Sequence, residues 1–151
     1  MADDRKFAKV IVAFDGSEDS IKAIRLAGSL ALVCGSDLTV VHIYSSPTIG
    51  FSAASGVPIP DYRELEEAKK EAARAVLARG LQLASEEGLK AKGELIEAPS
   101  VVEAIVKFAA DEKADLIVVG TRGMTGFKKL IIGSVSSGVV NHSPCSVLIA
   151  R

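Results

Sequence analysis

The sequence predicts an α/β fold, a Rossmann-like, five-stranded, parallel, doubly wound sheet with helices on both faces. Two short, uninterrupted apolar runs, KVIVAF at 9–14 and LIVV at 116–119, are typical of strands that are buried on both faces of a parallel sheet. Segments rich in good helix formers alternate with such runs along the chain. The length of 151 residues indicates a single domain that spans 1–151.

The chain opens with a strand, a turn, a helix and a second strand. The first strand covers 9–14 and ends at Asp15-Gly16-Ser17, where Ser17 is a candidate N-cap. Glu18 and Asp19 follow in the first helical turn, where the helix dipole favours negative charge. The helix continues to about Cys34, and the second strand covers 37–44. This unit places Asp15 and the end of the second strand at one edge of the sheet.

The middle of the chain contains a long loop, the longest helix and a less apolar strand. Residues 45–60 hold three prolines and two glycines and predict an irregular loop, whose apolar residues would cover a ligand or meet a partner subunit. Residues 61–87 are rich in Ala, Glu, Lys, Arg and Leu and predict a helix with a solvated charged face. The third strand covers 90–97, and its charges suggest a position near an edge of the sheet.

The last third of the chain contains two helices and two strands. Pro99-Ser100 opens a helix through 110, and the fourth strand covers 115–119. A helix from Ser134 to about Asn141 is broken by Pro144, and the fifth strand covers 146–150. In parallel sheets of this kind, ligands bind beyond the carboxyl ends of the strands at a topological switch point. The ends of the first, second and fourth strands are therefore the candidate site.

Composition argues against several function classes. A net charge of −1, 5% aromatic residues and no Trp do not fit a nucleic-acid binder. No apolar run reaches the roughly 18 residues of a membrane helix. The N-terminus, MADDRKFAKV, has no signal-peptide core, so a cytoplasmic location is expected. The two cysteines, Cys34 and Cys145, are expected to be small buried thiols rather than a disulfide or a metal site.

A glycine-rich loop follows the fourth strand and is the strongest functional signal. Its spacing is Gly120-x2-Gly123-x9-Gly133-Ser134, followed by a predicted helix. Strand, glycine loop and helix start form the arrangement in which backbone amides bind anions. Ser134, as a predicted N-cap, would cap the helix or contact a phosphate. The pattern is neither a Walker A loop nor the dinucleotide-binding G-x-G-x-x-G.

This loop resembles the nucleotide-binding signature of the universal stress protein family, in its ATP-binding branch. The opening KVIVAFDGSEDS, the second strand TVVHIYS and the ending NHSPCSVLIAR also resemble that family, in the same order. The resemblance implies an ATP-binding regulatory protein, with Mg²⁺ or Mn²⁺ bound through the phosphates. It assigns nucleotide contacts to eleven positions, namely Ala13, Asp15, Ile43, Val119, Gly120, Arg122, Gly123, Gly133, Ser134, Val135 and Ser136.

Several of these residues also have purely structural interpretations. Asp15 would be either a turn residue or a contact to a ribose hydroxyl or a phosphate-bound cation. Ile43, whose backbone would pair with the adenine edge by resemblance, and Val119 would also be sheet core. Arg122 would be either an exposed residue of the Gly-Thr-Arg-Gly turn or a contact to phosphate. His42 lies in an apolar strand and is more often a core histidine than a ligand.

No pattern of catalytic residues accompanies the loop, so binding is expected, with hydrolysis slow at best. The alternatives are a slow ATPase or nucleotide-dependent transferase, a binding module whose glycine loop is structural or which prefers AMP or cyclic AMP, and an electron-transfer flavoprotein-like protein. The apolar strand at Ser146 to Ala150 would be an aggregation risk as an open edge. Resemblance to the family implies a homodimer in which this strand pairs with its twin.

Overall fold

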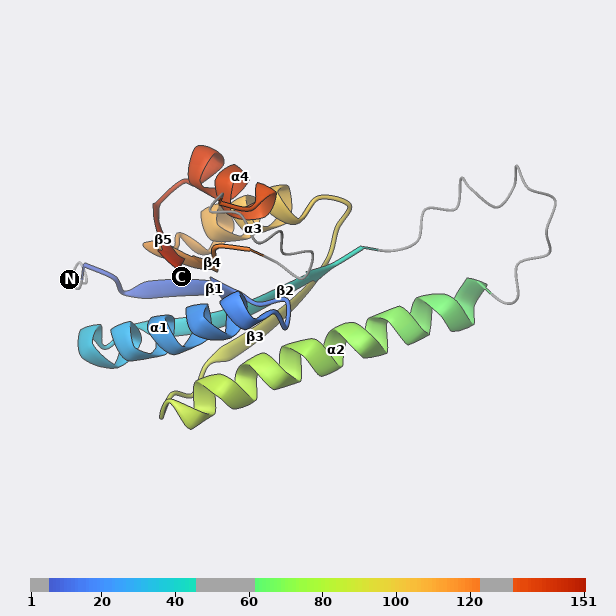
Figure 1. Cartoon of the computed structure of the whole chain (residues 1–151), viewed down its shortest axis with the longest axis horizontal. Helices are drawn as coiled ribbons and strands as arrows, with labels where there is room; N and C mark the ends of the chain where they lie inside the picture. Colours follow the sequence, from blue (N-terminus) through green and yellow to red (C-terminus); the bar gives the residue numbers. More distant parts are fainter. Residues whose placement is uncertain (1–5, 46–61, 123–131) are drawn as a thin grey trace.

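The computed structural model describes residues 6–45, 62–122 and 132–151, which form one parallel sheet between two layers of helices (Figure 1). The strand order is β3-β2-β1-β4-β5, and every neighbouring pair is parallel. This confirms the predicted fold class. The elements in chain order are β1 Lys9–Ala13, α1 Glu18–Cys34, β2 Asp37–Tyr44, α2 Tyr62–Glu86, β3 Lys92–Glu97, α3 Val101–Glu112, β4 Leu116–Gly120, α4 Ser134–His142 and β5 Ser146–Ala150.

The central strands divide their side chains between two cores because alternate residues of a strand point to opposite faces. In β1, Val10 and Val12 enter the core under α1 and α2, whereas Ile11 enters the core under α3 and α4. β4 does the same, with Leu116 and Val118 on one face and Ile117 and Val119 on the other. This two-sided burial is why both strands are apolar without interruption.

Each helix buries one face against the sheet, and its ends follow capping rules. Ser17 caps α1 by accepting a hydrogen bond from the amide of Ser20, as the sequence predicts. α1 ends at Gly35, whose left-handed φ of 65° lets its amide bond to the carbonyl of Ala31. Ser100 caps α3 in the same way through the amide of Glu103.

The predicted boundaries differ from the observed ones by a few residues at most. Phe14 falls just outside β1, and Lys90 and Ala91 precede β3. The prediction that β3 lies near an edge is confirmed. Most of the predicted loop, residues 46–60, lies outside the described residues. Among the helices that the structure describes, none is long and apolar enough to cross a membrane.

Candidate nucleotide site

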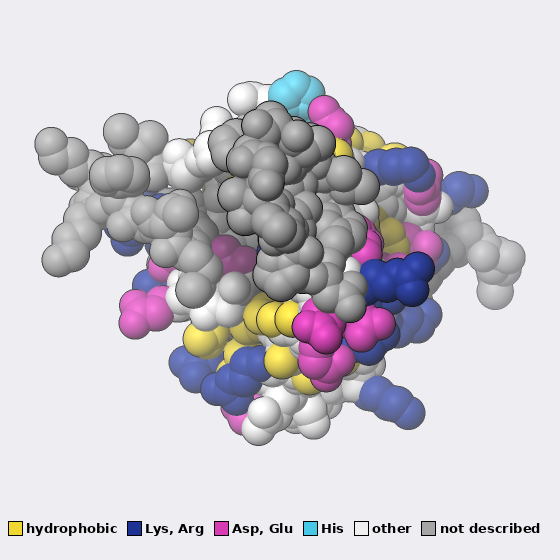
Figure 2. Space-filling model, turned by 90° about the vertical axis from the view of Figure 1, so that its right-hand side faces the viewer, with side chains coloured by type: hydrophobic (Ala, Val, Ile, Leu, Met, Phe, Trp, Pro, Cys, Tyr) yellow, Lys and Arg dark blue, Asp and Glu magenta, His cyan; other side chains and the backbone are white. Residues whose placement is uncertain are grey.

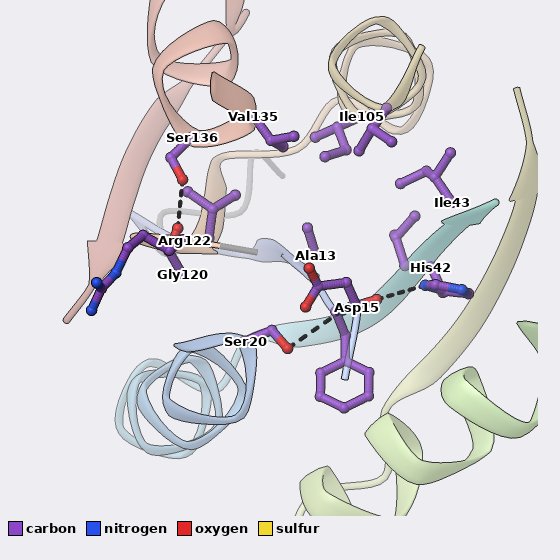
Figure 3. A pocket seen from close by; sticks show the side chains of 14 residues that line it. Ala13, Asp15, Ser20, His42, Ile43, Ile105, Gly120, Arg122, Val135 and Ser136 are labelled. Carbon is purple, nitrogen blue, oxygen red and sulfur yellow. Dashed lines mark hydrogen bonds between the residues drawn. The ribbon is translucent and has the colours of Figure 1, made fainter. Parts of the chain in front are cut away.

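A cavity of about 140 Å³ lies at the carboxyl ends of β1, β2 and β4, beneath the starts of α3 and α4 (Figure 3). The chain leaves β1 toward β2 on one side and later returns to β4 on the other, so the switch point is between β1 and β4. The cavity therefore occupies the place at which doubly wound sheets bind ligands. Its lining residues are Ala13, Phe14, Asp15, Ser20, Val41, His42, Ile43, Val101, Ile105, Val119, Gly120, Arg122, Val135 and Ser136.

The cavity has an apolar wall and a polar floor. Ile43 and Ile105 lie on one side, while Gly120 and Ser136 lie on the other, with Asp15 between them (Figure 3). An apolar cavity with a few convergent polar groups is the usual form of a small-molecule site. The arrangement fits a flat apolar ring with a polar substituent, and it brings together eight of the eleven predicted contacts.

Asp15 has a structural role and also retains a carboxylate oxygen for other contacts. Its Oδ1 accepts a hydrogen bond of 2.9 Å from the amide of Ser17, which closes the turn before α1. Among residues 6–45, 62–122 and 132–151, Oδ2 has no hydrogen-bond partner. The turn function is therefore observed, and the ligand contact remains a prediction.

The start of α1 and the end of β4 touch closely because residue 120 has no side chain. A Cβ on Gly120 would lie 2.7 Å from the carbonyl carbon of Asp19 and 2.8 Å from its oxygen. Asp19 is only 8% exposed, and its Oδ2 accepts a hydrogen bond of 3.1 Å from the amide of Arg122. Asp19 therefore ties α1 to the first residues of the glycine loop.

Arg122 pairs with this same carboxylate. Its Nε lies 3.6 Å from Oδ2 of Asp19, and its side chain points away from the middle of the cavity (Figure 3). Its backbone carbonyl also accepts a long hydrogen bond of 3.5 Å from Ser17 Oγ. In this conformation Arg122 borders the cavity mainly through its backbone.

Ser136 is buried and its hydroxyl is directed at the protein backbone. Ser136 Oγ lies 2.6 Å from the carbonyl of Gly120 and 3.1 Å from that of Thr121, which accept its proton. The hydroxyl thus holds α4 against the end of β4. Ser136 therefore has a structural role, and its contact with a nucleotide stays a prediction.

α4 begins without a side-chain cap. Gly133, not Ser134, is the N-cap residue, so the predicted position of Ser134 is wrong by one residue. The reason is the bond of 2.7 Å from the amide of Gly133 to the carbonyl of Thr121, which draws residue 133 to the end of β4. A Cβ at 133 would lie only 3.1 Å from that carbonyl oxygen.

Gly123, one of the eleven predicted contacts, lies outside the described residues. Within the described ranges, no cluster of three or more His, Cys, Asp or Glu side chains is arranged to hold a metal ion.

Sequence reasoning did not identify Asp19, Val101 or Ile105 as site residues. Asp19 had a signal, because helical spacing places it four residues before the buried Ala23, whereas Glu18 faces solvent. Val101 and Ile105 belong to α3, and only the packing of α3 brings them to the cavity.

The surface at this edge of the sheet carries charges of both signs. Figure 2 shows Lys and Arg side chains interspersed with Asp and Glu around hydrophobic atoms. At the end of β2, the Tyr44 hydroxyl donates to Glu97 Oε2 over 3.2 Å. Partial burial, followed by the Glu97 carboxylate, raises the pKa of the Tyr44 phenol above its ordinary value.

The fold and this cavity define a parallel α/β protein with a cavity at the switch point of its sheet. The Universal stress protein family matches residues 6–151, and the chain belongs to that family. A universal stress protein of Thermus aquaticus is 35% identical over 156 aligned positions that cover 96% of this chain and 99% of the relative.

Solved structures of the family share the fold. Universal stress protein UspA from Lactobacillus plantarum superposes with a TM-score of 0.79 at 24% identity, covering 96% of this chain and 98% of its own. A universal stress protein solved in complex with cAMP has a TM-score of 0.68 at 26% identity, covering 96% and 97% of the two chains. Some members of this fold thus bind adenine nucleotides.

Proposed function

We propose that this chain is an ATP-binding regulatory protein in which the cavity between β1 and β4 holds the nucleotide. The observation that carries the proposal is the start of α4, which opens on the cavity and has no side-chain cap among the described residues. The starts of α1 and α3, in contrast, are capped by Ser17 and Ser100. Free amides at a helix start favour an anion such as phosphate.

The base would lie against the apolar wall, and the phosphates would extend toward α4. A cavity of about 140 Å³ is smaller than typical sites for a whole drug-sized ligand, so it suits the base better than the entire nucleotide. Ile43, Ile105 and Val119 supply apolar surface to the base. Ala13 would contribute backbone, and the glycines at 120, 123 and 133, with the amides of Ser134, Val135 and Ser136, would surround the phosphates.

Asp15 would contact the ribose or a divalent cation. Its Oδ2 is available, and Mg²⁺ or Mn²⁺ commonly joins one carboxylate to phosphate oxygens. The structural relative that was solved with cAMP supports the proposal that the ligand of this chain is an adenine nucleotide. AMP or cyclic AMP is therefore the alternative ligand to ATP.

Slow ATP hydrolysis is the second candidate activity. A hydrolase needs a group that orients the attacking water. Asp15 is the acid that lines the cavity in the described ranges, and its Oδ1 is engaged by the amide of Ser17. We therefore propose that ATP binding, rather than turnover, is the signal.

Calorimetry with ATP, ADP, AMP and cyclic AMP, each with and without Mg²⁺, tests the proposal. Asp15→Asn is the informative variant, because an amide oxygen can still accept the bond from Ser17 while the negative charge is lost. We expect the parent to bind ATP most tightly and the variant to lose the Mg²⁺ dependence. A folded, nucleotide-free parent that binds none of the four ligands would sink the proposal.

We also propose a homodimer through β5, Ser146–Ala150. Val147, Leu148 and Ile149 form an apolar edge strand, whereas the opposite edge, β3, carries charges that discourage pairing. Hydrogen exchange separates the edges, since a β5 dimer should protect outward amides of β5 but leave those of β3 fast. A monomer by ultracentrifugation with equally fast exchange at both edges would contradict the dimer.

The same proposal treats residues 1–151 as one domain in the cytoplasm, where ATP and Mg²⁺ are available. A single domain should unfold in one cooperative transition, followed by circular dichroism and fluorescence together. Fractionation of cells that express the full chain tests the location, and recovery with membranes would contradict it.

A further inference from the structure

The backbone ladder between β1 and β2 ends at Phe14. Ala13 is opposite Val41, and the amide of Phe14 still donates to the carbonyl of Val41 over 2.9 Å. In a parallel ladder, the next bond would run from the amide of Ile43 to the carbonyl of Phe14. That bond is not formed.

A histidine side chain takes the place of this bond. Nδ1 of His42 lies 2.8 Å from the carbonyl oxygen of Phe14 (Figure 3). A carbonyl oxygen only accepts, so Nδ1 carries the proton and, in the neutral ring, Nε2 does not. His42 therefore ends the ladder with its own ring.

Ile43 is left with two backbone groups at the cavity. Successive residues of a strand present these groups to alternate sides, and the carbonyl of Tyr44 accepts from the amide of Ala98 beside β3. The N–H and C=O of Ile43 thus face the side of β1. Neither has a partner within the residues that the structure describes, although Ile43 is only 9% exposed.

Buried backbone groups are seldom left unpaired, so these two indicate a ligand with a matching edge. Adenine carries a donor amine beside an acceptor ring nitrogen, which matches one carbonyl and one amide. Guanine and hypoxanthine carry the reverse order, an acceptor oxygen beside a donor N–H. One orientation of the base in the apolar cavity therefore accepts adenine and rejects the other two.

We propose that His42 is a positioning residue for base recognition, because its bond to Phe14 keeps the backbone edge of Ile43 open for adenine. This inference rests on the proposed function. Removing the Nδ1 donor frees the Phe14 carbonyl for the amide of Ile43, so the ladder extends and the base loses its donor. His42 acts through Ile43 and need not touch the nucleotide.

The test compares ATP with inosine triphosphate, which differ at the base edge and share the ribose and the triphosphate. Calorimetry on the full chain should show that the parent prefers ATP. His42→Leu should reduce this preference about tenfold, because a pair of edge contacts is lost. His42→Asn should restore most of it, because the amide nitrogen of Asn can replace Nδ1 as donor.

The chain contains a matched control for this substitution. Nδ1 of His142 also contacts a backbone carbonyl, that of Gly138, at 2.9 Å, but on α4 and away from the cavity lining. His142→Leu should leave the ratio of ATP to inosine triphosphate affinities unchanged. A change as large as that of His42→Leu would overturn the inference.

Magnetic resonance tests the geometry without relying on affinity. In the parent, the ring of His42 should show the Nδ1–H tautomer, and the amide of Ile43 should exchange slowly only after ATP is added. In His42→Leu, this amide should be protected without nucleotide.

The outcomes distinguish a failure of the role inferred for His42 from a failure of the proposed ATP binding. A parent that binds no nucleotide overturns both. A parent that prefers ATP, with the same preference in a folded His42→Leu variant, overturns the inference alone and leaves the ATP-binding proposal standing.

Discussion

Two helices, α1 and α4, begin at the same edge of the sheet, yet their first turns are built differently. At α1, Ser17 caps the helix, Asp15 holds the amide of Ser17, and Asp19 accepts from Arg122. At α4, a glycine stands at the cap position and no described side chain bonds to the first amides. The start of α1 has a side-chain cap, and the start of α4 has none among the described residues.

This difference distinguishes the scaffold from the surface proposed to bind phosphate. Two helices that begin at the same edge of a sheet are not equally suited to bind an anion, because the anion needs helix amides that lack other partners. The capped start of α1 holds the end of β4 in place through Gly120 and Asp19. The open start of α4 is then presented to the cavity in a defined position.

The largest effect is expected where the two starts are held together. Gly120→Ala places a Cβ 2.7 Å from the backbone of Asp19, which cannot move without displacing α1. We expect the free energy of unfolding to fall by about 3 kcal/mol, measured by urea denaturation.

The control is another glycine with a similar nominal clash. A Cβ on Gly93 would lie 2.8 Å from Cδ1 of Leu81, the far end of a flexible side chain. Gly93→Ala should therefore cost clearly less than Gly120→Ala. Equal costs would show that the contact with the Asp19 backbone has no special weight.

Removing the tie between α1 and the loop is expected to have the next largest effect. Asp19→Ala removes a buried carboxylate that accepts from the partly buried amide of Arg122, which should lower the free energy of unfolding by about 2 kcal/mol. Glu18→Ala, at the exposed neighbouring acid, should change it far less. Thermal unfolding of both variants measures the two losses of stability. Similar losses in the two variants would contradict a specific role for Asp19.

Closing the open start of α4 should weaken ATP binding without unfolding the protein. Gly133→Asp supplies a cap and a negative charge where phosphate is proposed to bind, so we expect ATP affinity to fall about tenfold while stability is kept. Calorimetry measures the affinity.

Gly133→Ala separates crowding from capping, because it adds only the Cβ near the carbonyl of Thr121. The charge argument requires a smaller loss of affinity in Gly133→Ala than in Gly133→Asp. The opposite order would mean that space alone explains the effect.

The smallest effect is expected from removing the serine that caps a helix. Ser17→Ala removes the α1 cap and should cost about 1 kcal/mol of unfolding free energy. Ser100→Ala removes the corresponding cap of α3 and should cost a similar amount or slightly less, because Ser17 also contacts Arg122. Denaturation of both variants measures these costs. An unchanged unfolding free energy in Ser17→Ala would show that the Ser17 cap does not stabilise the start of α1.

Much of this molecule follows from local patterns. Continuous apolar runs predicted β1 and β4, and serine caps predicted the starts of α1 and α3. The glycine spacing predicted a site at the end of β4, and the cavity lies there. The helix starts at Ser134 as predicted, but Ser134 is not its cap, since a bond between Gly133 and Thr121 places Gly133 at the N-cap position.

The sequence by itself determined the order of elements, the parallel sheet and the edge that carries the site, because these depend on periodicity and on residues close together in the chain. Only the tertiary structure decided that Asp19 is paired with Arg122, that Ile105 lines the cavity and that His42 ends the ladder of Ile43. Those contacts join residues far apart in the chain. Their geometry depends on how helices and strands pack, and no local pattern contains that information.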